Sequence, residues 1–355
     1  MIQSFLVKIL LAPFSLLYGM GVTIHGFLYK TGLRKGFNFD LPVISVGNLT
    51  IGGAGKSPHI EYLIRILQPY INVATLSRGY KRSTKGFRIV KPTDDATLVG
   101  DEPLQFIRKF PEIIVAVGEN RIFSIPEIIK NAPDTDVILL DDAFQNRAVN
   151  PLINILLTEY SRPFTKDFLL PSGRLREWRS GSQRADIVIV SKCPPILEKE
   201  DKDKIEKSLD LFPRQKIFFS YYKYLQPYFL LNPVERVVME NDMQILLICA
   251  IAKTDYLLDH LTQEVESVTS LEFEDHRYFT TRDLMKLKAT FDAMTTEKKI
   301  IMTTEKDAMR LELHRDFLIE HKMPIFVLPV EVEFHFNESN DFNQLIKDRL
   351  LEFKI

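Results

Sequence analysis

Cysteine, tryptophan and glycine are all scarce in this sequence. The 355 residues include two cysteines, one tryptophan and 15 glycines. Cys193 and Cys249 lie far apart and have no metal-ligand spacing, which excludes a zinc motif built on paired cysteines. So few cysteines also indicate a reducing compartment. The sequence shows no internal repeats and no low-complexity tracts.

The sequence also lacks a large net charge of either sign. Lysine and arginine number 46 and the acids 47, which gives a formal net charge of −1. This balance argues against a surface coated for nucleic acid or for acidic substrates, so we expect no nucleic-acid partner. A hydrophobic fraction of 45% is enough for a sizeable core. The length suits two ordinary domains or one large one.

The first part of the chain lacks acidic residues altogether. The stretch "MIQSFLVKILLAPFSLLYGMGVTIHGFLYK" is apolar, and the first acidic residue of the chain is Asp40. Ile9 to Leu28 is about long enough to span a bilayer. Pro13 and several glycines interrupt it, which makes a uniform transmembrane helix a poor description.

Three interpretations of this stretch compete. One is a helix buried in the protein core. A cleaved signal peptide is less favoured, because Lys8 comes late and no small-residue cleavage site follows. Export would also separate a phosphate-binding loop from cytosolic nucleotide. We favour a membrane-associating segment over residues 1–35 that lies in or dips into the bilayer, with Lys30, Arg34 and Lys35 at anionic headgroups.

The rest of the chain alternates short β-branched runs with helix-like stretches. Several runs have no polar alternation, as expected of parallel strands that are buried on both faces. The predicted strands are Val43–Val46, Val73–Leu76, Ile113–Val117, Val137–Leu140, Ile153–Leu157 and Ile187–Val190. One helix face is predicted from Ile60, Leu63, Ile64 and Leu67. The fold class is therefore α/β, with a doubly wound parallel sheet of the P-loop NTPase type over residues 36–220.

From about Tyr221 the pattern begins again. The runs "QILLICAIA", "KKIIMTTEKD" and "PIFVLPV" predict three further strands with helical stretches between them. Phe342, Leu345, Ile346 and Leu350 mark a last amphipathic helix. We expect a second, smaller α/β domain over residues 221–355.

The stretch "VGNLTIGGAGKSP" has the form of a phosphate-binding loop. A loop that leads from a strand into a helix aims several backbone N–H groups at one point, where phosphate binds well. Thr50 occupies the place of the usual first glycine, but the strand–loop–helix context is present. Lys56 can reach the β- and γ-phosphates and the Ser57 hydroxyl can ligate Mg²⁺. The expected nucleotide-binding residues are Thr50, Ile51, Gly52, Gly53, Ala54, Gly55, Lys56 and Ser57.

An acidic partner for Mg²⁺ is expected at the end of an apolar strand. In "DVILLDDAFQ" the strand Val137–Leu140 runs directly into Asp141 and Asp142. A turn that merely ends the strand is the alternative. Two adjacent carboxylates just past a buried strand are hard to explain by packing, so we assign the pair to metal binding.

Four other motifs admit both a functional and a structural interpretation. "TLVGDEPLQF" carries Asp101 and Glu102, and "FEDHRYF" places Asp275 beside His276, whose side chain can equally be structural. "TLSRGYKR" ends a strand with Ser77, Arg78 and Tyr80. "LPSGRLREW" carries Arg174, Arg176 and Glu177. The arginine loops can bind anionic or sugar groups, or they can be solvated loops.

A phosphate loop alone does not define the reaction. A guanine-reading Asn/Thr-Lys-x-Asp motif is not supported, because the nearest match, "AKTD" at Ala252–Asp255, lacks the first residue. A kinase needs a group that orients the acceptor hydroxyl, for which Asp101 and His276 are candidates. A membrane-associated NTPase acting as a switch or chaperone and a nucleotide-binding regulator without catalysis remain open at this point.

Taken together, the motifs resemble the tetraacyldisaccharide 4'-kinases, or lipid A 4'-kinases. The residues that carry the resemblance span Val46 to Leu311, most of the chain. They are, in order, "VGNLTIGGAGKSP", "LSRGYKR", "VGDEP", "DDAFQNR", "LPSGRLRE", "ADIVIVSK", "FEDHRYF" and "TTEKDAMRL". The ordered set is far more specific than any one member. Two positions depart from the family's DDGFQHR pattern, since Ala143 and Asn146 replace its glycine and histidine.

The resemblance implies ATP-dependent phosphorylation of the 4' hydroxyl of a tetraacylated glucosamine disaccharide 1-phosphate. The product would be lipid IVA, an intermediate of lipid A biosynthesis, and the cofactors would be ATP and Mg²⁺. The substrate would be a membrane-embedded glycolipid. The enzyme would therefore lie on the cytoplasmic face of the bacterial inner membrane, in contact with its lipids and with no obligate protein partner.

The resemblance also implies roles for individual residues, in a site between the two domains. Asp101 corresponds to a proposed catalytic base, supported by His276, and Lys56 joins them as a catalytic residue. The expected metal site consists of Ser57, Asp141, Asp142 and Glu102. The expected substrate-binding residues are Ser77, Arg78, Tyr80, Gln145, Arg176 and Glu177.

Overall fold

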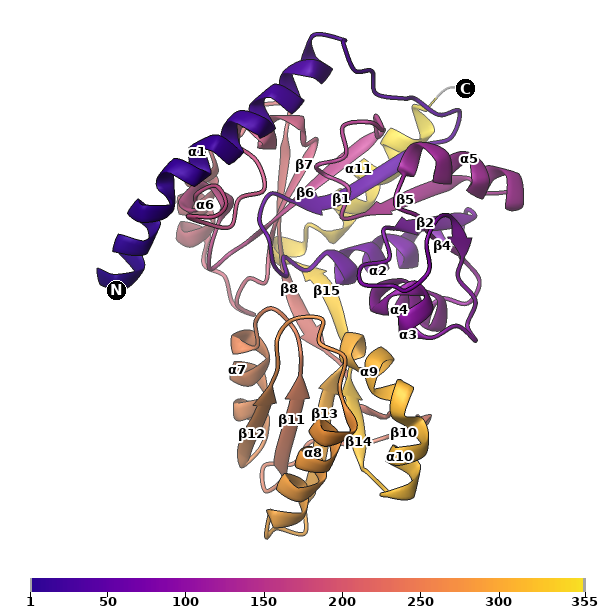
Figure 1. The fold of residues 1–355 in the computed structure, drawn as a ribbon, viewed down its shortest axis with the longest axis vertical. Coiled ribbons are helices and arrows are strands. Elements are labelled where there is room, and N and C mark those ends of the chain that lie inside the picture. Colours follow the sequence, from indigo (N-terminus) through magenta and orange to yellow (C-terminus); the bar gives the residue numbers. More distant parts are fainter. Residues whose placement is uncertain (1, 354–355) are drawn as a thin grey trace.

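Two sheets with helices packed around them form the body of the protein, and one long helix lies along its side (Figure 1). The computed structural model describes residues 2–353, and for residues 2–6 it describes the backbone alone. Within that range one sheet has nine strands and the other has six. The architecture is the predicted combination of a large and a smaller α/β unit.

The larger sheet has the strand order β15-β8-β7-β6-β1-β5-β2-β4-β3. The strands from β8 to β4 run parallel, and β15 and β3 pair antiparallel at the two edges. Their bounds are β1 Val43–Asn48, β2 Val73–Ser77, β3 Arg88–Ile89, β4 Ile114–Val117, β5 Val137–Asp141, β6 Ile153–Glu159, β7 Ile187–Ser191, β8 Lys216–Tyr224 and β15 Val330–Phe334. The six predicted strands of this region are confirmed.

Both faces of this sheet are covered, which explains why its strands lack polar alternation. The helices are α2 Lys56–Leu67, α3 Ala96–Val99, α4 Asp101–Lys109, α5 Arg121–Asn131 and α6 Lys199–Leu209. Ile44 of β1 joins the core cluster that includes Ile60 and Ile64 of α2. Its neighbour Val43 joins a separate cluster with Ile125 of α5, because successive side chains of a strand point to opposite faces.

The smaller sheet has the order β10-β9-β14-β13-β11-β12. Its strands are β9 Tyr228–Phe229, β10 Asn232–Arg236, β11 Gln244–Cys249, β12 Ser267–Glu272, β13 Lys299–Thr304 and β14 Ile325–Leu328. The helices around it are α7 Asp255–Glu264, α8 Thr281–Ala293, α9 Glu305–Leu311 and α10 Arg315–Glu320. Strands β12, β11, β13 and β14 are parallel neighbours.

The sheet order departs from the predicted division at residue 220. Strand β8 runs through that position, and β15 pairs with it in the larger sheet. The run "PIFVLPV" predicted one strand, but it divides at Pro329 into β14 and β15, since proline cannot donate to a sheet hydrogen bond. The final helix α11, Ser339–Leu351, buries Phe342 against Phe218 of β8, with ring centroids 5.2 Å apart. The chain therefore returns to the larger unit for its last segment.

Helix α1, Ile2–Lys30, is apolar yet exposed. Within the described residues it is the one helix long and apolar enough to cross a membrane, with a mean hydropathy of 1.7 over a window that is 11% buried. A helix of the protein core is thereby excluded. Gly19 of α1 lies so close to Trp178 that a Cβ there would be 2.5 Å from the indole. The Trp178 Nε1 donates to Thr23 Oγ1 at 2.9 Å, which fixes α1 against the loop between β6 and β7 of the larger unit.

Candidate active site

The loop between β1 and α2 has the strand–loop–helix form predicted for phosphate binding. Gly52 and Gly55 adopt φ values of +106° and +84°, which side-chain-bearing residues rarely take. A second segment holds the loop from outside, because Ile51 N donates to Arg174 O and Arg176 N donates to Leu49 O, both at 2.7 Å. The start of α2 lines an open pocket between the two units, to which Lys56 and Ser57 contribute from one side and Ala252 and His276 from the other.

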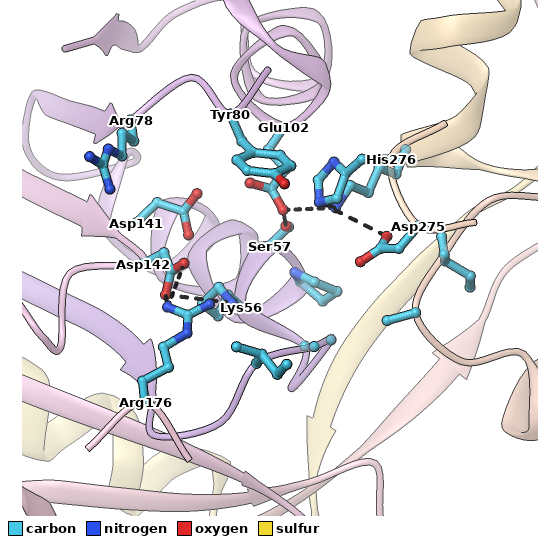
Figure 2. Close-up of a pocket in the computed structure, with 18 of the residues that line it drawn as sticks. Lys56, Ser57, Arg78, Tyr80, Glu102, Asp141, Asp142, Arg176, Asp275 and His276 are labelled. Atoms are coloured by element: carbon cyan, nitrogen blue, oxygen red, sulfur yellow. Dashed lines mark hydrogen bonds and ion pairs between the residues drawn. The ribbon is translucent and has the colours of Figure 1, made fainter. Parts of the chain in front are cut away.

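Lys56 points into this space toward Asp142. Its Nζ lies 3.6 Å from Asp142 Oδ1 and donates to Asn48 Oδ1 at 3.3 Å. Arg176 Nη1 contacts both Asp142 oxygens at 2.9 and 3.0 Å. Burial acts to raise the pKa of Asp142, but Lys56 and Arg176 outweigh it, so the pKa is lowered. Figure 2 shows these three side chains converging on one side of the pocket.

Asp141 has a different environment from its neighbour. It ends β5 and is buried, with Oδ2 accepting from Ser77 Oγ at 3.3 Å. Its Oδ1 has no hydrogen-bond partner among the described residues. Burial, and then the nearby carboxylate of Glu102, raise the pKa of Asp141 to about 7. Ser57 Oγ in turn donates to Glu102 Oε1 at 3.4 Å.

The side-chain oxygens of Ser57, Glu102, Asp141 and Asp142 have the chemistry of a magnesium site. Mg²⁺ prefers oxygen ligands, and it commonly takes one or two carboxylates and completes its shell with water and substrate phosphates. The unpartnered Oδ1 of Asp141 and the crowding of carboxylates fit a cation in the same space. Within residues 2–353 no group of three or more His, Cys, Asp or Glu could hold a metal by itself. Phosphate oxygens would therefore have to supply part of the coordination.

Asp101 and His276 meet across the two units. Asp101 is the first residue of α4 and follows Gly100, whose φ is +94°. His276 comes from the loop after β12, and its Nδ1 lies 3.1 Å from Asp101 Oδ2. Arg310 Nη1 lies 3.1 Å from the same oxygen. Burial opposes ionisation, but Lys306, His276 and Arg310 together hold the pKa of Asp101 well below its usual value.

Sequence reasoning assigned no role to Lys306 and Arg310, which contact the Asp101–His276 pair. Both lie in "TTEKDAMRL", which contributed to the resemblance without a role being assigned. Lys306 Nζ contacts Glu102 Oε1 at 3.0 Å and His276 Nε2 at 3.1 Å. Arg310 is 1% exposed and also contacts Asp307 and the Ala250 carbonyl.

Of the six predicted substrate-binding residues, Ser77 and Arg176 contact the acidic pair as described above, and the other four fall into two groups. Arg78 and Tyr80 are exposed, line the pocket, and Tyr80 packs edge-on against His276 with ring centroids 4.8 Å apart. Gln145 and Glu177 are instead engaged with the protein. Gln145 Nε2 donates to Asn48 O at 2.7 Å, while the buried Glu177 accepts from arginines 147 and 184 at 3.1 and 2.7 Å.

One cavity of about 1240 Å³ is lined by most of these groups, including Lys56, Asp142 and His276, while Asp101 lies behind its wall. Its wall includes Tyr18, Val22 and His25 of α1, so the exposed apolar helix borders the same space as the phosphate loop. Sequence reasoning also missed Lys192, which lies 4.2 Å from the Tyr256 ring centroid near the loop. Burial lowers the pKa of Lys192 to about 8 despite the neighbouring carboxylate of Glu159.

A phosphate loop, an acidic pair at the end of the adjacent strand and a histidine that pairs with a buried carboxylate lie around one cavity and define a P-loop phosphotransferase. A family model described as tetraacyldisaccharide-1-P 4'-kinase matches residues 7–351. The chain therefore belongs to the tetraacyldisaccharide-1-P 4'-kinase family and is a kinase of lipid A biosynthesis.

Individual relatives agree with this family. The chain is 44% identical over 343 residues to a tetraacyldisaccharide 4'-kinase of Phocaeicola vulgatus, covering 95% of this chain and 94% of the relative. A relative of the same name from Flavobacterium johnsoniae is 40% identical over 350 residues, covering 97% and 99%. A crystal structure of LpxK from Aquifex aeolicus in complex with ATP matches with a TM-score of 0.72 and 27% identity, covering 97% of this chain and 99% of that one.

Proposed function

We propose that this chain transfers the γ-phosphate of ATP to the 4' hydroxyl of a tetraacylated glucosamine disaccharide 1-phosphate, and that the residues of the shared cavity carry the reaction. The observation behind the residue roles is that Lys56, Asp142 and His276 line one cavity that α1 also borders, and that Asp101 contacts His276 at 3.1 Å. The bond from the acceptor oxygen to phosphorus forms as the bond to the β-phosphate oxygen breaks. ADP leaves, and the hydroxyl proton of the acceptor passes late in the step to the Asp101 carboxylate.

Lys56 and Arg176 are assigned to charge neutralisation in this proposal. Phosphoryl transfer passes through a loose transition state, so positioning and neutralisation supply most of the catalysis. Asp142 forms ion pairs with the Lys56 and Arg176 side chains next to the phosphate loop. Glu177 lines the cavity but is assigned an indirect role, because its carboxylate oxygens already accept hydrogen bonds from Gln145, Arg147 and Arg184.

Asp101 is assigned to orienting the acceptor hydroxyl. A carboxylate with a lowered pKa is a weak base, which suits a reaction in which the hydroxyl proton leaves late. Tyr80 packs against His276, and Arg78 lines the same cavity; both are exposed and are proposed to contact the sugar or its acyl linkages.

Ser57, Glu102, Asp141 and Asp142 are proposed to hold Mg²⁺, which would supply charge neutralisation at the β- and γ-phosphates when bound. Asp141→Asn and Asp142→Asn should each abolish activity or raise the Mg²⁺ concentration needed for half-maximal activity, since an amide is a poor replacement for a carboxylate ligand. The measurement is a Mg²⁺ titration of initial rates.

Thermal unfolding without Mg²⁺ provides the control for these two variants. Asp141→Asn should keep or raise the melting temperature, because a buried carboxylate oxygen without a partner costs stability. Asp142→Asn should lower it slightly, because Arg176 loses its ionic partner. If both variants retain the parental Mg²⁺ dependence, the acidic pair is structural.

Attachment to the cytoplasmic face of the inner membrane through α1 completes the proposal. Its outward side carries Leu10, Phe14 and Leu16, which are 73%, 60% and 62% exposed. Burying this surface in the bilayer would place the cavity wall at the headgroups, where the glycolipid's sugars lie.

Replacing Leu10, Phe14 and Leu16 together by glutamine should release the protein from membranes. It should raise the apparent KM for lipid far more than the KM for ATP, because the change affects location and not chemistry. Vesicle sedimentation and initial rates measure the two effects. The matched control is Val234→Gln with Val238→Gln, which removes exposed apolar side chains from the smaller unit. Unchanged sedimentation of the α1 variant would contradict membrane attachment through this face.

The reaction itself is tested by incubating the protein with γ-labelled ATP and a 4'-unphosphorylated lipid A precursor. Label should enter the lipid at the 4' position. Lipid-independent release of labelled phosphate would instead indicate a switch-like NTPase, and binding without turnover would indicate a regulator.

A further inference from the structure

A lysine at the end of α4 ties the two units together at a point that the proposed chemistry does not use. We propose that Lys109 is a positioning residue, which holds the smaller unit, through Glu305, at a fixed place relative to the phosphate-loop helix α2. This inference rests on the proposed function, because the proposed reaction needs side chains from both units. Neither residue belongs to the phosphate loop, to the metal-ligand set or to the predicted substrate-binding residues.

The Lys109 side chain lies between two buried carboxylates. It is 22% exposed, and its Nζ lies 2.7 Å from Glu61 Oε2 and donates to Glu305 Oε1 at 2.6 Å. Glu61 belongs to α2 in the larger unit, and Glu305 is the first residue of α9 in the smaller unit. One ammonium group therefore bridges both units through short charge-assisted contacts, which are roughly twice as strong as neutral hydrogen bonds.

The remaining carboxylate oxygens are also held in place. Glu305 Oε2 accepts from the backbone N–H of Val330 at 3.3 Å, and Val330 begins β15, where the chain returns from the smaller unit to the larger sheet. Glu61 Oε1 accepts from Gln105 Nε2 at 2.7 Å. The contacts around Lys109 therefore join α2, α4, α9 and the start of β15.

The two carboxylates depend on Lys109 to different degrees. Arg65 Nη2 also lies 3.4 Å from Glu61 Oε2, so Glu61 keeps a cation when Lys109 is replaced. Arg65 shares its charge with Glu331, which it contacts at 3.4 Å as well. Among the described residues, Lys109 is the one cation within 4.0 Å of a Glu305 oxygen. Replacing the lysine should therefore free the smaller unit, while α2 stays attached to α4.

The functional consequence concerns the distance between the two halves of the site. Glu305 is followed by Lys306, which contacts His276 Nε2 at 3.1 Å. A displacement of α9 would therefore move His276 relative to Lys56 at the start of α2. Group transfer is sensitive to such changes, since a misplacement of about 1 Å can cost on the order of 10²-fold in rate. Lys109 keeps these two parts of the site in register without contacting a reacting group.

The test measures an inter-unit distance and the kinetics of the full chain in detergent. Spin labels on Phe123→Cys in α5 and Met285→Cys in α8, both exposed positions, report the distance between the units by pulsed electron paramagnetic resonance. The natural Cys193 and Cys249 are buried and should not react with the label. The label pair is placed in the parent and in each variant.

Lys109→Met should broaden the distribution of this distance. The kcat for lipid phosphorylation should fall about 3–30-fold, the range for residues that modulate the coupling between sites without touching a ligand. The KM for ATP should stay within about twofold, because α2 keeps its attachment to α4 through Glu61 and Gln105.

Three further variants separate positioning from a general effect on folding. Lys109→Met/Glu305→Gln removes the buried carboxylate that the single variant leaves without a cation, so it should melt at a higher temperature than Lys109→Met. It should still show the broadened distances and the lowered kcat, because the ionic bridge is absent. Lys109→Arg can re-form the bridge and should restore most of both.

The third variant, Lys202→Met, is the matched control. Lys202 is 19% exposed and pairs with Glu338 at 2.7 Å within the larger unit. Its loss should lower the melting temperature slightly and leave kcat and the inter-unit distance unchanged.

Parental distances in the folded double variant would overturn the proposal, and so would broadened distances with a parental kcat. A raised KM for ATP with parental distances would also overturn it, because Lys109 would then support the phosphate loop from within the larger unit. Failure of the proposed function is distinguishable, since a parent that transfers no phosphate to lipid would still report the distance between the units.

Discussion

Lys56→Ala is expected to lower kcat for lipid phosphorylation by at least ~10²-fold, or ~3 kcal/mol of barrier, by analogy with removing one preorganised electrostatic donor. The reason is that the ammonium stands at the start of α2, where the phosphate loop collects backbone N–H groups and the positive helix end. A loose transition state spreads charge over the transferred group, and a cation at this point neutralises it.

The folded state should tolerate this change. The Lys56 side chain is 11% exposed and contacts Asp142 and Asn48 Oδ1, and among the described residues Lys56 is the one donor to that oxygen. Asn48 also donates to Thr50 O at 2.7 Å, and Asp142 keeps Arg176. The melting temperature should therefore fall only slightly, because one hydrogen bond is lost and no core packing changes.

Initial rates with labelled ATP measure the effect of Lys56→Ala. Lys204→Ala, a change of an exposed lysine on α6, is the matched control and should retain full activity. Near-normal turnover by Lys56→Ala would remove the phosphate-loop assignment, whatever the affinity for ATP.

Local patterns in the sequence were sufficient to predict the phosphate loop and the strands around it. The run Val137–Leu140 has no polar interruption because both of its faces are covered, and it forms β5 together with Asp141. The phosphate loop was predictable from its glycines, because Gly52 and Gly55 adopt positive φ values that residues with side chains rarely take. In both cases a physical requirement acts on neighbours in the chain.

Contacts between residues that are far apart in the chain could not be predicted from local sequence patterns. Lys306 and Arg310 contact Glu102 and Asp101 across more than two hundred positions, and a lysine in a first helical turn looks the same whether it is solvated or buried. Sequence also could not separate Asp141 from Asp142. Asp142 adopts φ +46° and turns toward Lys56, while Asp141 stays in the strand and buries an oxygen.

Asp101→Ala and His276→Ala are each expected to lower kcat roughly 10²–10⁴-fold, the range for a group that assists proton transfer, with little change in the KM for ATP. Neither residue belongs to the phosphate loop, so nucleotide binding should persist. Asp101→Asn is the milder companion variant, because its side-chain oxygen can still accept the hydrogen bond that Glu102 N donates at 3.0 Å.

Stability measurements address the alternative that His276 only holds the smaller unit together. The flanking Phe273 and Phe279 pack against each other, with ring centroids 5.6 Å apart, while the His276 ring contacts Tyr80 and Asp101. Its removal should therefore affect kcat more than the melting temperature. His314→Ala is the matched control, since His314 contacts only the Phe279 carbonyl among described protein groups and should lower stability without lowering kcat of the folded enzyme.

The double variant Asp101→Ala/His276→Ala should be far less impaired than the product of the single losses. The reason is that His276 Nδ1 contacts Asp101 Oδ2 at 3.1 Å, so the histidine acts through the carboxylate and has nothing to orient once that carboxylate is gone. Residues that share one role show such non-additive effects. The measurement is a double-mutant cycle on kcat with saturating ATP and lipid. Strictly multiplicative losses would show that the two residues contribute independently, and the contact between the two units would then have no part in orienting the acceptor.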